Sequence, residues 1–200
     1  MRFSIIIPAH NAESYIRKGL ESIKQQTFTD YELIVVCDNC TDNTQKVAEE
    51  YGAITKAVNF GQDGYTRNTG IEMAKGEWVL FMDDDDWWLH EYVLEQLDRK
   101  LTENSGIDVL CFSFIFKHWK YATPTGNDGA HWIAVWNKCW RREFIGKTRF
   151  SRRYSKSDVD FNNGMMAKNP KMLDWDMPMY YYNYLRPGSI SEQARRRISK

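Results

Sequence analysis

A short apolar run that ends in four consecutive aspartates is the feature of this sequence that most limits its fold. Trp78 to Met82 are apolar, and Asp83 to Asp86 follow at once. Five apolar residues are too few for a core helix, but they suit a strand covered on both faces, as in a parallel sheet. Four adjacent carboxylates raise each other's pKa unless a cation compensates them. The run therefore indicates either a site for a hard divalent cation, which prefers oxygen ligands, or a solvated acidic loop.

Three more strands are expected before this run and one after it. The segments Phe3 to Ile7, Tyr31 to Val36, Ala53 to Val58 and Val109 to Phe116 are apolar and rich in β-branched residues, which is typical of strands. Alternation of such strands with helices predicts right-handed crossovers and a parallel sheet with helices on both faces. The helices expected from apolar periodicity and capping residues are 12–23, 41–51, 65–74, 90–101 and 158–168.

Polar residues follow three of these strands directly. Pro8 to His10 come after the first strand, Asp38 after the second, and Asp83 to Asp86 after the fourth. Because parallel α/β sheets bind ligands outside the carboxyl ends of their strands, these three segments are expected to meet at one edge. This convergence favours a metal-assisted ligand site over a solvated acidic loop.

Composition argues against a nucleic-acid partner and against a membrane-spanning segment. The chain has 200 residues, enough for one domain with a sizeable core, and its 27 basic and 27 acidic side chains cancel. Such a balance provides no overall field for nucleic acid. The sequence has neither the ~20 apolar residues of a membrane span nor the shape of a signal peptide at its start. A cytoplasmic protein that binds no nucleic acid is therefore expected.

The four cysteines do not have the paired spacing of a zinc site. Cys37 and Cys40 have the spacing of a redox pair, but Asp38 and Asn39 between them supply nothing that lowers a thiol pKa. Neutral, unreactive thiols are therefore the expectation.

The alternation of strands and helices ends after residue 116. The segment from Lys117 to Gly129 is rich in Thr, Pro, Gly and Asn and is a candidate lid or substrate-shaping loop. A dense aromatic stretch runs from Trp132 to Trp140. A short segment from Lys171 to Trp175 precedes an expected final strand from Met179 to Leu185.

Eight segments of the chain resemble the family 2 nucleotide-sugar glycosyltransferases, which have the GT-A fold. No single segment is decisive, but their order and spacing together are specific, and the resemblance extends to about Ser191. The segments are 5–11, 25–27, 37–44, 67–70, 74–77, 81–87, 136–138 and 186–190.

This resemblance implies a fold and an activity. The fold is expected to be α/β of the GT-A, Rossmann-like type: a mostly parallel central sheet flanked by helices, with a C-terminal acceptor-side subregion. Residues 1–115 would form the donor-binding half and residues 116–200 the acceptor-side half of one domain. The activity would be an inverting, metal-dependent transfer of a sugar from a nucleotide diphosphate sugar, expected to be a UDP-sugar, to a hydroxyl of a growing glycan or lipid-linked saccharide. Peripheral association with the inner face of a membrane is a further expectation.

The resemblance also implies roles for individual residues. Asp85 matches the last carboxylate of the family's Asp-x-Asp motif, and is expected to bind the Mn²⁺ or Mg²⁺ that bridges the donor diphosphate. Asp158 resembles the carboxylate that removes the proton of the acceptor hydroxyl. Contacts to the nucleotide are expected from Pro8, Ala9, His10, Asp38, Arg67, Asp83 and Asp84. Acceptor-side positions are Asp86, Trp87, Trp136 and Asn137, with Trp88 as a further stacking candidate.

The sequence also leaves structural alternatives for these residues. Asp38 could form an Asx turn, Asp158 or Asp86 could cap a helix, and Arg67 could be a charge on a helix surface. The chain departs from the usual Val-Asp-Asp-Gly-Ser-Thr-Asp loop of the family in three places, where Cys37, Asn39 and Cys40 replace Asp, Gly and Ser. The usual Glu before the catalytic carboxylate is replaced by Ser157.

Two other functions remain open from the sequence. A non-catalytic nucleotide-sugar binding module would use the same donor residues. A sugar nucleotidyltransferase should carry a glycine-rich phosphate loop with basic residues near the first strand, and Pro8 to Glu13 has neither.

Overall fold

The computed structural model describes residues 1–116, 120–124, 134–153, 156–184, 186 and 189 of the chain. Among these residues, nine strands form one sheet in the order β3-β2-β1-β4-β8-β6-β9-β5, with β7 paired to β6 beside this path. The strands are β1 (Phe3–Ala9), β2 (Tyr31–Asp38), β3 (Ile54–Val58), β4 (Trp78–Phe81), β5 (Trp87–Trp88), β6 (Val109–Phe116), β7 (Lys120–Ala122), β8 (Lys138–Arg141) and β9 (Met172–Tyr182). The helices are α1 (Ile16–Lys24), α2 (Thr44–Glu50), α3 (Asp63–Met73), α4 (Val93–Glu103), α6 (Arg142–Ile145) and α7 (Ser157–Met166).

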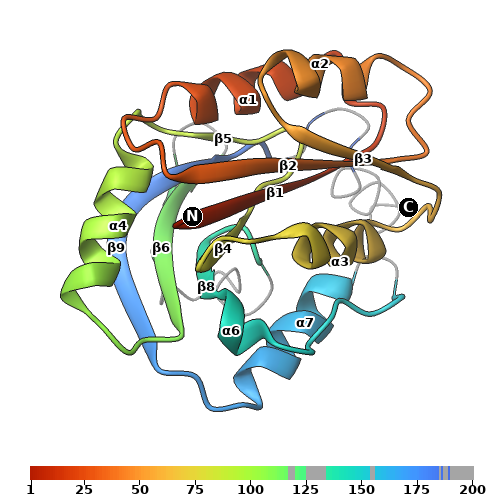
Figure 1. Cartoon of the computed structure of the whole chain (residues 1–200). Helices are drawn as coiled ribbons and strands as arrows, with labels where there is room; N and C mark the ends of the chain where they lie inside the picture. Colours follow the sequence, from red (N-terminus) through yellow and green to blue (C-terminus); the bar gives the residue numbers. More distant parts are fainter. Residues whose placement is uncertain (117–119, 125–133, 154–155, 185, 187–188, 190–200) are drawn as a thin grey trace.

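The first four strands are parallel, as the alternation of strands and helices predicts. β1 lies between β2 and β4, and β2 also pairs with β3. β8 then runs antiparallel between β4 and β6, while β6 and β9 are parallel to each other. The expected mostly parallel sheet flanked by helices is confirmed, and a mixed half extends it (Figure 1).

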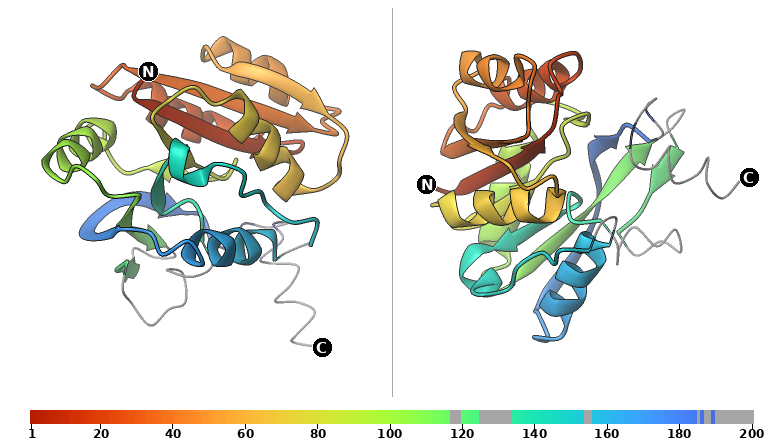
Figure 2. Two further views of the ribbon diagram at one scale, coloured as in Figure 1. Left: turned by 60° about the horizontal axis from the view of Figure 1, so that its bottom comes forward. Right: turned by 90° about the vertical axis from the view of Figure 1, so that its right-hand side faces the viewer.

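The pleat of the central strands divides the core into two layers. Side chains alternate between the faces of a strand, so Ile5 and Ile7 of β1 pack with apolar residues of α1, α2 and α4. Ile6 between them packs on the other face with Ile71 of α3, and Phe161 of α7 belongs to the same cluster. Figures 1 and 2 show α1 and α2 on one side of the sheet and α3, α6 and α7 on the other. Helix α3 therefore reaches the carboxyl edge of the sheet from one side, and α1 from the other.

Several predicted element boundaries are wrong. The first helix begins at Ile16 rather than near residue 12, because the amide of Glu13 is held by Asp42 Oδ2 at 3.0 Å and residues 12–15 form a turn. The helix predicted at 90–101 begins at Val93. Strand β8 begins within the predicted aromatic stretch and ends one residue beyond it, and one continuous strand, β9, runs through the two predicted C-terminal segments. Of the predicted lid segment, only residues 120–124 are described, and 120–122 form β7; the rest lies outside the described residues.

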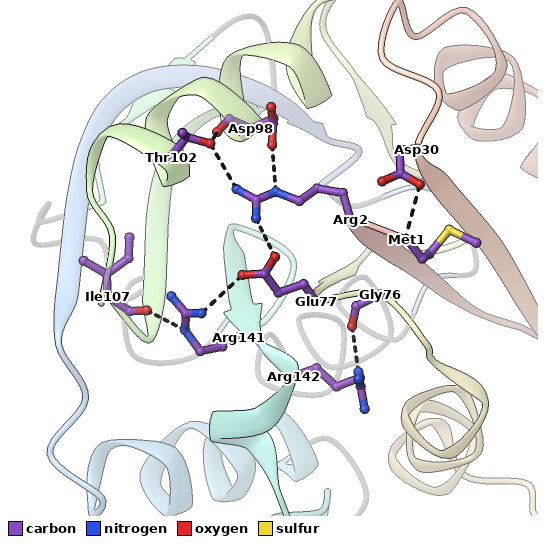
Figure 3. Close-up of polar contacts among 10 residues, drawn as sticks. All are labelled: Met1, Arg2, Asp30, Gly76, Glu77, Asp98, Thr102, Ile107, Arg141 and Arg142. Carbon is purple, nitrogen blue, oxygen red and sulfur yellow. Dashed lines mark hydrogen bonds and ion pairs between the residues drawn. The ribbon is translucent and has the colours of Figure 1, made fainter.

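Paired charges occupy the amino edge of the sheet (Figure 3). Arg2 Nε donates to Asp98 at 2.7 Å and its Nη1 donates to Glu77 at 2.5 Å. Arg141 Nη1 donates to the second oxygen of Glu77 at 3.2 Å. This network joins the amino ends of β1 and β4 to α4 and β8, on the edge opposite the predicted site. No helix in the described part of the chain is long and apolar enough to cross a membrane.

Candidate functional site

The segment Pro8 to His10, at the end of β1, contacts the two segments predicted to lie beside it, at the ends of β2 and β4. The Nδ1 atom of His10 donates a hydrogen bond to the carbonyl oxygen of Asp38 at the end of β2, at 2.7 Å. The backbone amide of His10 donates to Asp84 Oδ2 at 3.2 Å. The structure thus brings the three predicted segments together at the carboxyl edge of the sheet.

Arg67 of α3 joins three carboxylates at this edge. Its Nη2 atom donates to Asp83 Oδ1 and its Nη1 atom to Asp63 Oδ2, each at 2.7 Å. The same Nη1 atom lies 3.4 Å from Asp158 Oδ1 of α7. Arg67 is only 4% exposed, so the alternative of a helix-surface charge is wrong.

Close packing of α3 against β1 makes this position of Arg67 possible. A Cβ atom at Gly70 would lie 2.3 Å from Cγ2 of Ile6, so only glycine permits this approach. Arg67 stands one turn before Gly70 on the same helix. The sequence therefore places the guanidinium within reach of the loop that follows β4.

Burial raises the pKa of several carboxyl groups at this edge, and Arg67 offsets that effect only in part. Burial raises the pKa of Asp83 to about 6, although Arg67 acts in the opposite direction. Burial and the neighbouring Asp85 raise the pKa of Asp84 to about 8. Burial also raises the pKa of Asp158 above its usual value, against the effect of Arg67. An additional cation at this edge would therefore be favoured electrostatically.

Asp85 is the predicted metal ligand. Its Oδ2 atom accepts a hydrogen bond from Arg186 Nε at 2.6 Å, and the Arg186 guanidinium also lies 3.9 Å from the centre of the Tyr15 ring. The positive charge beside Asp85 in this structure is thus the Arg186 guanidinium. In the part of the chain that the structure describes, no group of three or more His, Cys, Asp or Glu side chains is arranged to hold a metal.

The donor set nevertheless suits a cation that is shared with a substrate. Mg²⁺ and similar ions are commonly held by one or two carboxylates together with substrate phosphates, rather than by a complete protein cage. Asp85, with Asp83 two residues before it, provides such a pair of carboxylates.

Two buried polar atoms of the site have no hydrogen-bond partner among the described residues. They are Arg67 Nε and Asp158 Oδ1, although the latter is within ion-pair distance of Arg67. Buried polar atoms in folded proteins nearly always have a partner, which can be a water or a ligand. The two atoms are therefore free to form a hydrogen bond with a water or a ligand.

Asp38 holds the loop before α3. Its Oδ1 atom accepts hydrogen bonds from the amides of Phe60 and Gly61, and its Oδ2 atom from the amide of Gln62 and the hydroxyl of Thr66, at 2.7 to 3.0 Å. Burial by itself raises the pKa of Asp38, but these hydrogen bonds outweigh burial and lower it. In this conformation, Asp38 organises the loop, and its predicted contact with the base stays a prediction.

Asp86 is the most deeply buried of the four consecutive aspartates. It is 1% exposed, and its two oxygens accept hydrogen bonds from the Tyr180 hydroxyl at 2.6 Å and the Asn183 amide at 2.7 Å. It does not cap α4, whose N-cap residue is Tyr92. The capping alternative is therefore wrong, and a direct contact with an acceptor does not fit this burial. Because the Tyr180 hydroxyl also accepts a hydrogen bond from the Asp83 amide at 3.1 Å, Asp86 anchors the acidic loop to β9.

The predicted acceptor-side aromatic residues differ in exposure. Trp87 is half-buried, and both faces of its ring are occupied: it stacks on Tyr181, with ring centres 4.1 Å apart, and Lys18 Nζ lies 3.2 Å from its ring centre. Trp88 is 4% exposed and belongs to the core. Trp136 is 6% exposed and stacks against Tyr180 at 4.8 Å. Trp88 and Trp136 are therefore core residues rather than free sugar platforms.

Asn137 is also buried. Its carbonyl oxygen accepts a hydrogen bond from the Phe112 amide, and its Oδ1 atom accepts one from Lys138 Nζ at 2.9 Å. The burial does not fit the prediction that this side chain lines the acceptor side. Asp158 lies in the first turn of α7, whose N-cap residue is Lys156, so Asp158 is not the capping residue.

Three residues that shape the site were not predicted from the sequence. Asp63 could have been found, because it lies four residues before Arg67 on one helix. Tyr180 and Lys138 carry no local signal, since the first lies in a run of tyrosines and the second among aromatic residues.

Residues 4–171 match the sequence profile of the family described as glycosyl transferase family 2. The glycosyltransferase GlyA of Streptococcus pneumoniae is 34% identical over 221 aligned residues, which cover 95% of this chain and 31% of GlyA. The chain spans less than half the length of the first curated relatives that it matches.

Two solved structures share the architecture. Staphylococcus aureus TarS in complex with UDP-GlcNAc superposes with a TM-score of 0.79 at 25% identity, covering 96% of this chain and 61% of that one. The mannosyltransferase PcManGT from Pyrobaculum calidifontis in complex with GDP-Man and Mn²⁺ gives a TM-score of 0.75 at 16% identity, covering 98% and 60%. The fold is therefore the GT-A fold of these enzymes, and the chain belongs to glycosyl transferase family 2.

Proposed function

We propose that this chain is an inverting glycosyltransferase that uses a UDP-sugar and a divalent cation. The observation that carries the proposal is the position of Arg67, which contacts Asp83 of the acidic loop and Asp158 of α7 at the same time. One guanidinium thereby links the candidate metal motif to the candidate base. The likeness to TarS with bound UDP-GlcNAc supports a UDP-sugar as the donor.

In the proposed reaction, Asp158 accepts the proton of the acceptor hydroxyl as its oxygen attacks the anomeric carbon. An alcohol is a poor nucleophile, so a positioned carboxylate lowers the barrier. The bond from the anomeric carbon to the diphosphate breaks in the same displacement, which inverts the configuration. Arg67 keeps Asp158 and Asp83 in place, and Pro8, Ala9 and His10 position the nucleoside.

Asp85, with Asp83 beside it, would hold Mn²⁺ or Mg²⁺. When bound, such a cation stabilises the charge that develops on the departing diphosphate. The presence of Mn²⁺ in the structure of PcManGT, which shares the fold, agrees with this proposal.

The acceptor is proposed to be a hydroxyl of a glycan or lipid-linked saccharide, reached from the side of Trp87. The relative TarS is a poly(ribitol-phosphate) beta-N-acetylglucosaminyltransferase, which supports a polymeric hydroxyl acceptor. Residues 1–115 would serve the donor and residues 116–200 the acceptor. A cytoplasmic location, with peripheral contact to the inner face of a membrane, is part of the same proposal.

Thermal unfolding with UDP and UDP-GlcNAc, each without metal, with Mn²⁺ and with Mg²⁺, tests this function. A ligand at about 100 times its dissociation constant stabilises the folded state by about 2.7 kcal/mol, which raises the Tm by several degrees in a chain of this size. We expect a rise that requires both nucleotide and Mn²⁺. Asp85→Ala should lose the Mn²⁺-dependent part of the rise.

Asp158→Asn tests the role of Asp158 as a general base separately from nucleotide binding. It should keep the nucleotide-dependent rise in Tm but lower transfer, or hydrolysis of the donor by water, by about 10²- to 10⁴-fold. Asp30→Ala is the matched control, because Asp30 is exposed at the opposite edge, where it pairs with the N-terminal amine (Figure 3). Failure of every nucleotide to raise the Tm with either cation would contradict the proposal.

The two alternative functions give different results. A binding module would show the rise in Tm but no transfer and no hydrolysis, whatever the acceptor. A nucleotidyltransferase given UTP and a sugar phosphate would join them and release pyrophosphate from the UTP.

A further inference from the structure

Two cysteines lie close together beside the nucleotide segments. Cys37 is in β2, where it is the register partner of Ala9, and Cys40 is in the loop that follows, with its Sγ atom 3.4 Å from the carbonyl oxygen of the same Ala9. Cys37 belongs to the core cluster against which Cys40 also packs, and Asn39 between them has a φ of +53°, a left-handed conformation that turns the chain back after β2. The expectation of unreactive thiols rests on the two intervening residues alone, and it does not account for this arrangement.

The two thiols have different surroundings. Cys37 is 2% exposed, whereas Cys40 is half-buried and reachable from solvent. The hydrogen bond from Cys37 is the main influence that lowers the pKa of Cys40, to about 6, and the Asn11 amide and the Thr44 side chain add to it. The same bond, together with burial, raises the pKa of Cys37. Cys40 is thus the reactive member and Cys37 its buried partner.

Cys40 also contacts the segment at the end of β1. Its Sγ atom lies 3.4 Å from the carbonyl oxygen of Ala9. The next residue, Thr41, donates its amide to Asn11 Oδ1 at 2.8 Å. The carbonyl of Asp38, between the two cysteines, accepts the hydrogen bond from His10. A change of the sulfur contacts therefore acts directly on the residues proposed to position the nucleoside.

The other two cysteines provide an internal comparison. Cys111 and Cys139 lie in β6 and β8 and are fully buried in the sheet. Burial raises the pKa of both thiols, that of Cys111 to about 12. Neither is suited to react with a reagent in solution.

We propose that Cys37 and Cys40 form a reversible redox pair, and that its oxidation to a disulfide weakens binding of the donor nucleotide. The disulfide would take the Cys40 sulfur away from its contacts with Ala9 and Asn11 and shift the loop that holds His10. The chemical part of the proposal is independent of the activity, and the effect on binding rests on the proposed function.

A peroxide is a sufficient oxidant. The Cys40 thiolate attacks one peroxide oxygen, so an S–O bond forms, the O–O bond breaks and hydroxide leaves. The Cys37 sulfur then attacks the Cys40 sulfur, forming the S–S bond and expelling the oxygen, which leaves as water with the Cys37 proton. The two thiols lose two electrons, and the peroxide is reduced to water.

Intact-mass measurement of the purified chain tests the chemistry. With hydrogen peroxide at neutral pH, the chain should lose the mass of two hydrogens and recover it with dithiothreitol. Cys40→Ser should abolish this loss, and Cys37→Ser should stop at a sulfenic acid that dimedone traps. Cys139→Ala is the matched control and should oxidise like the original chain. No loss of thiols in the original chain, or an unchanged loss in Cys40→Ser, would overturn the pair.

The affinity for UDP with Mn²⁺, measured on the reduced and oxidised chain, tests the effect on binding. We expect the Kd to rise about tenfold on oxidation, the equivalent of one lost hydrogen bond, with no rise in peroxide-treated Cys40→Ser. Equal affinities would overturn the effect on binding and leave the proposed function intact. If the reduced chain does not bind UDP, the proposed function fails and so does the effect on binding, while the mass measurement still decides the chemistry.

Discussion

Lys138 is a fully buried charge next to the candidate base. Its Nζ atom donates hydrogen bonds to the Ala134 carbonyl at 2.5 Å and to Asn137 Oδ1 at 2.9 Å. Burial lowers the pKa of Lys138 to about 8, although Cys111, Asp158 and Asp174 act in the opposite direction. In return, Lys138 lowers the pKa of Asp158. The residue therefore helps to keep the candidate base ionised and also makes the fold sensitive to pH.

The stability of the chain should rise with pH above about 8 because of Lys138. The pKa of Lys138 is about 8 in the folded state and about 10.4 in the unfolded state. Between these values the unfolded state binds more protons, so the free energy of unfolding rises with pH, by at most about 1.4 kcal/mol per pH unit. Urea unfolding of the chain and of Lys138→Met between these pH values measures the difference.

Only the difference between the two proteins is attributed to Lys138, because other groups titrate in the same range. Lys147→Met, at an exposed position, is the matched control and should follow the original chain. A parallel pH dependence in Lys138→Met and the original chain would contradict the assignment.

At the scale of elements, Asp38 joins the end of β2 to the start of α3. Its four hydrogen bonds fix residues 60–62 and, through Thr66, the first turns of the helix that carries Arg67. The two predicted donor-site residues, Asp38 and Arg67, are therefore coupled through the backbone.

Asp38→Asn should destabilise the chain in the absence of any nucleotide. The new side-chain amide nitrogen would face hydrogen-bond donors where Asp38 has an accepting oxygen. The free energy of unfolding, measured in urea at neutral pH, should therefore fall by about 1 to 3 kcal/mol. Because the pKa of Asp38 is lowered in the folded state, the stabilisation is present above the unfolded pKa and is lost as pH falls through the folded pKa. Asp30→Asn, at the exposed opposite edge, is the control. If stability is unchanged and the affinity for UDP falls, Asp38 contacts the nucleotide base and does not stabilise the loop.

At the scale of the molecule, the order of strands interleaves the two proposed halves. β8, from the second half, lies between β4 and β6 of the first, and β9 pairs with both β6 and β5. The Tyr180 hydroxyl of β9 bonds to the acidic loop after β4. The halves share one sheet and one set of core contacts.

A fragment of residues 1–115 should therefore not fold cooperatively. It would leave β6 without β8 and β9, and β4 without its second neighbour. The full chain should unfold in one transition in urea, followed by circular dichroism, and the fragment should show none. A fragment of residues 1–189 retains the described elements and is the control. A cooperative transition in 1–115 would instead show that the donor half is a separate domain.

Local patterns in the sequence are enough to specify the first half of this protein. Runs such as Phe3 to Ile7 and Trp78 to Met82 have local periodicity that specifies strands, and short strands joined through helices must lie parallel. The carboxyl ends of parallel strands share an edge, so the positions of Asp38 and Asp83 in the sequence already placed them together.

The remaining features depend on long-range contacts. The place of β8 between β4 and β6, the burial of Asp86 under Tyr180, the buried charge of Lys138 and the loop contacts of Asp38 all depend on partners far away in the chain. Periodicity and spacing report which faces of an element are apolar, but they do not report which other element covers them. Long-range packing settles that choice, and with it which of the aspartates at the end of β4 are buried and which face the site.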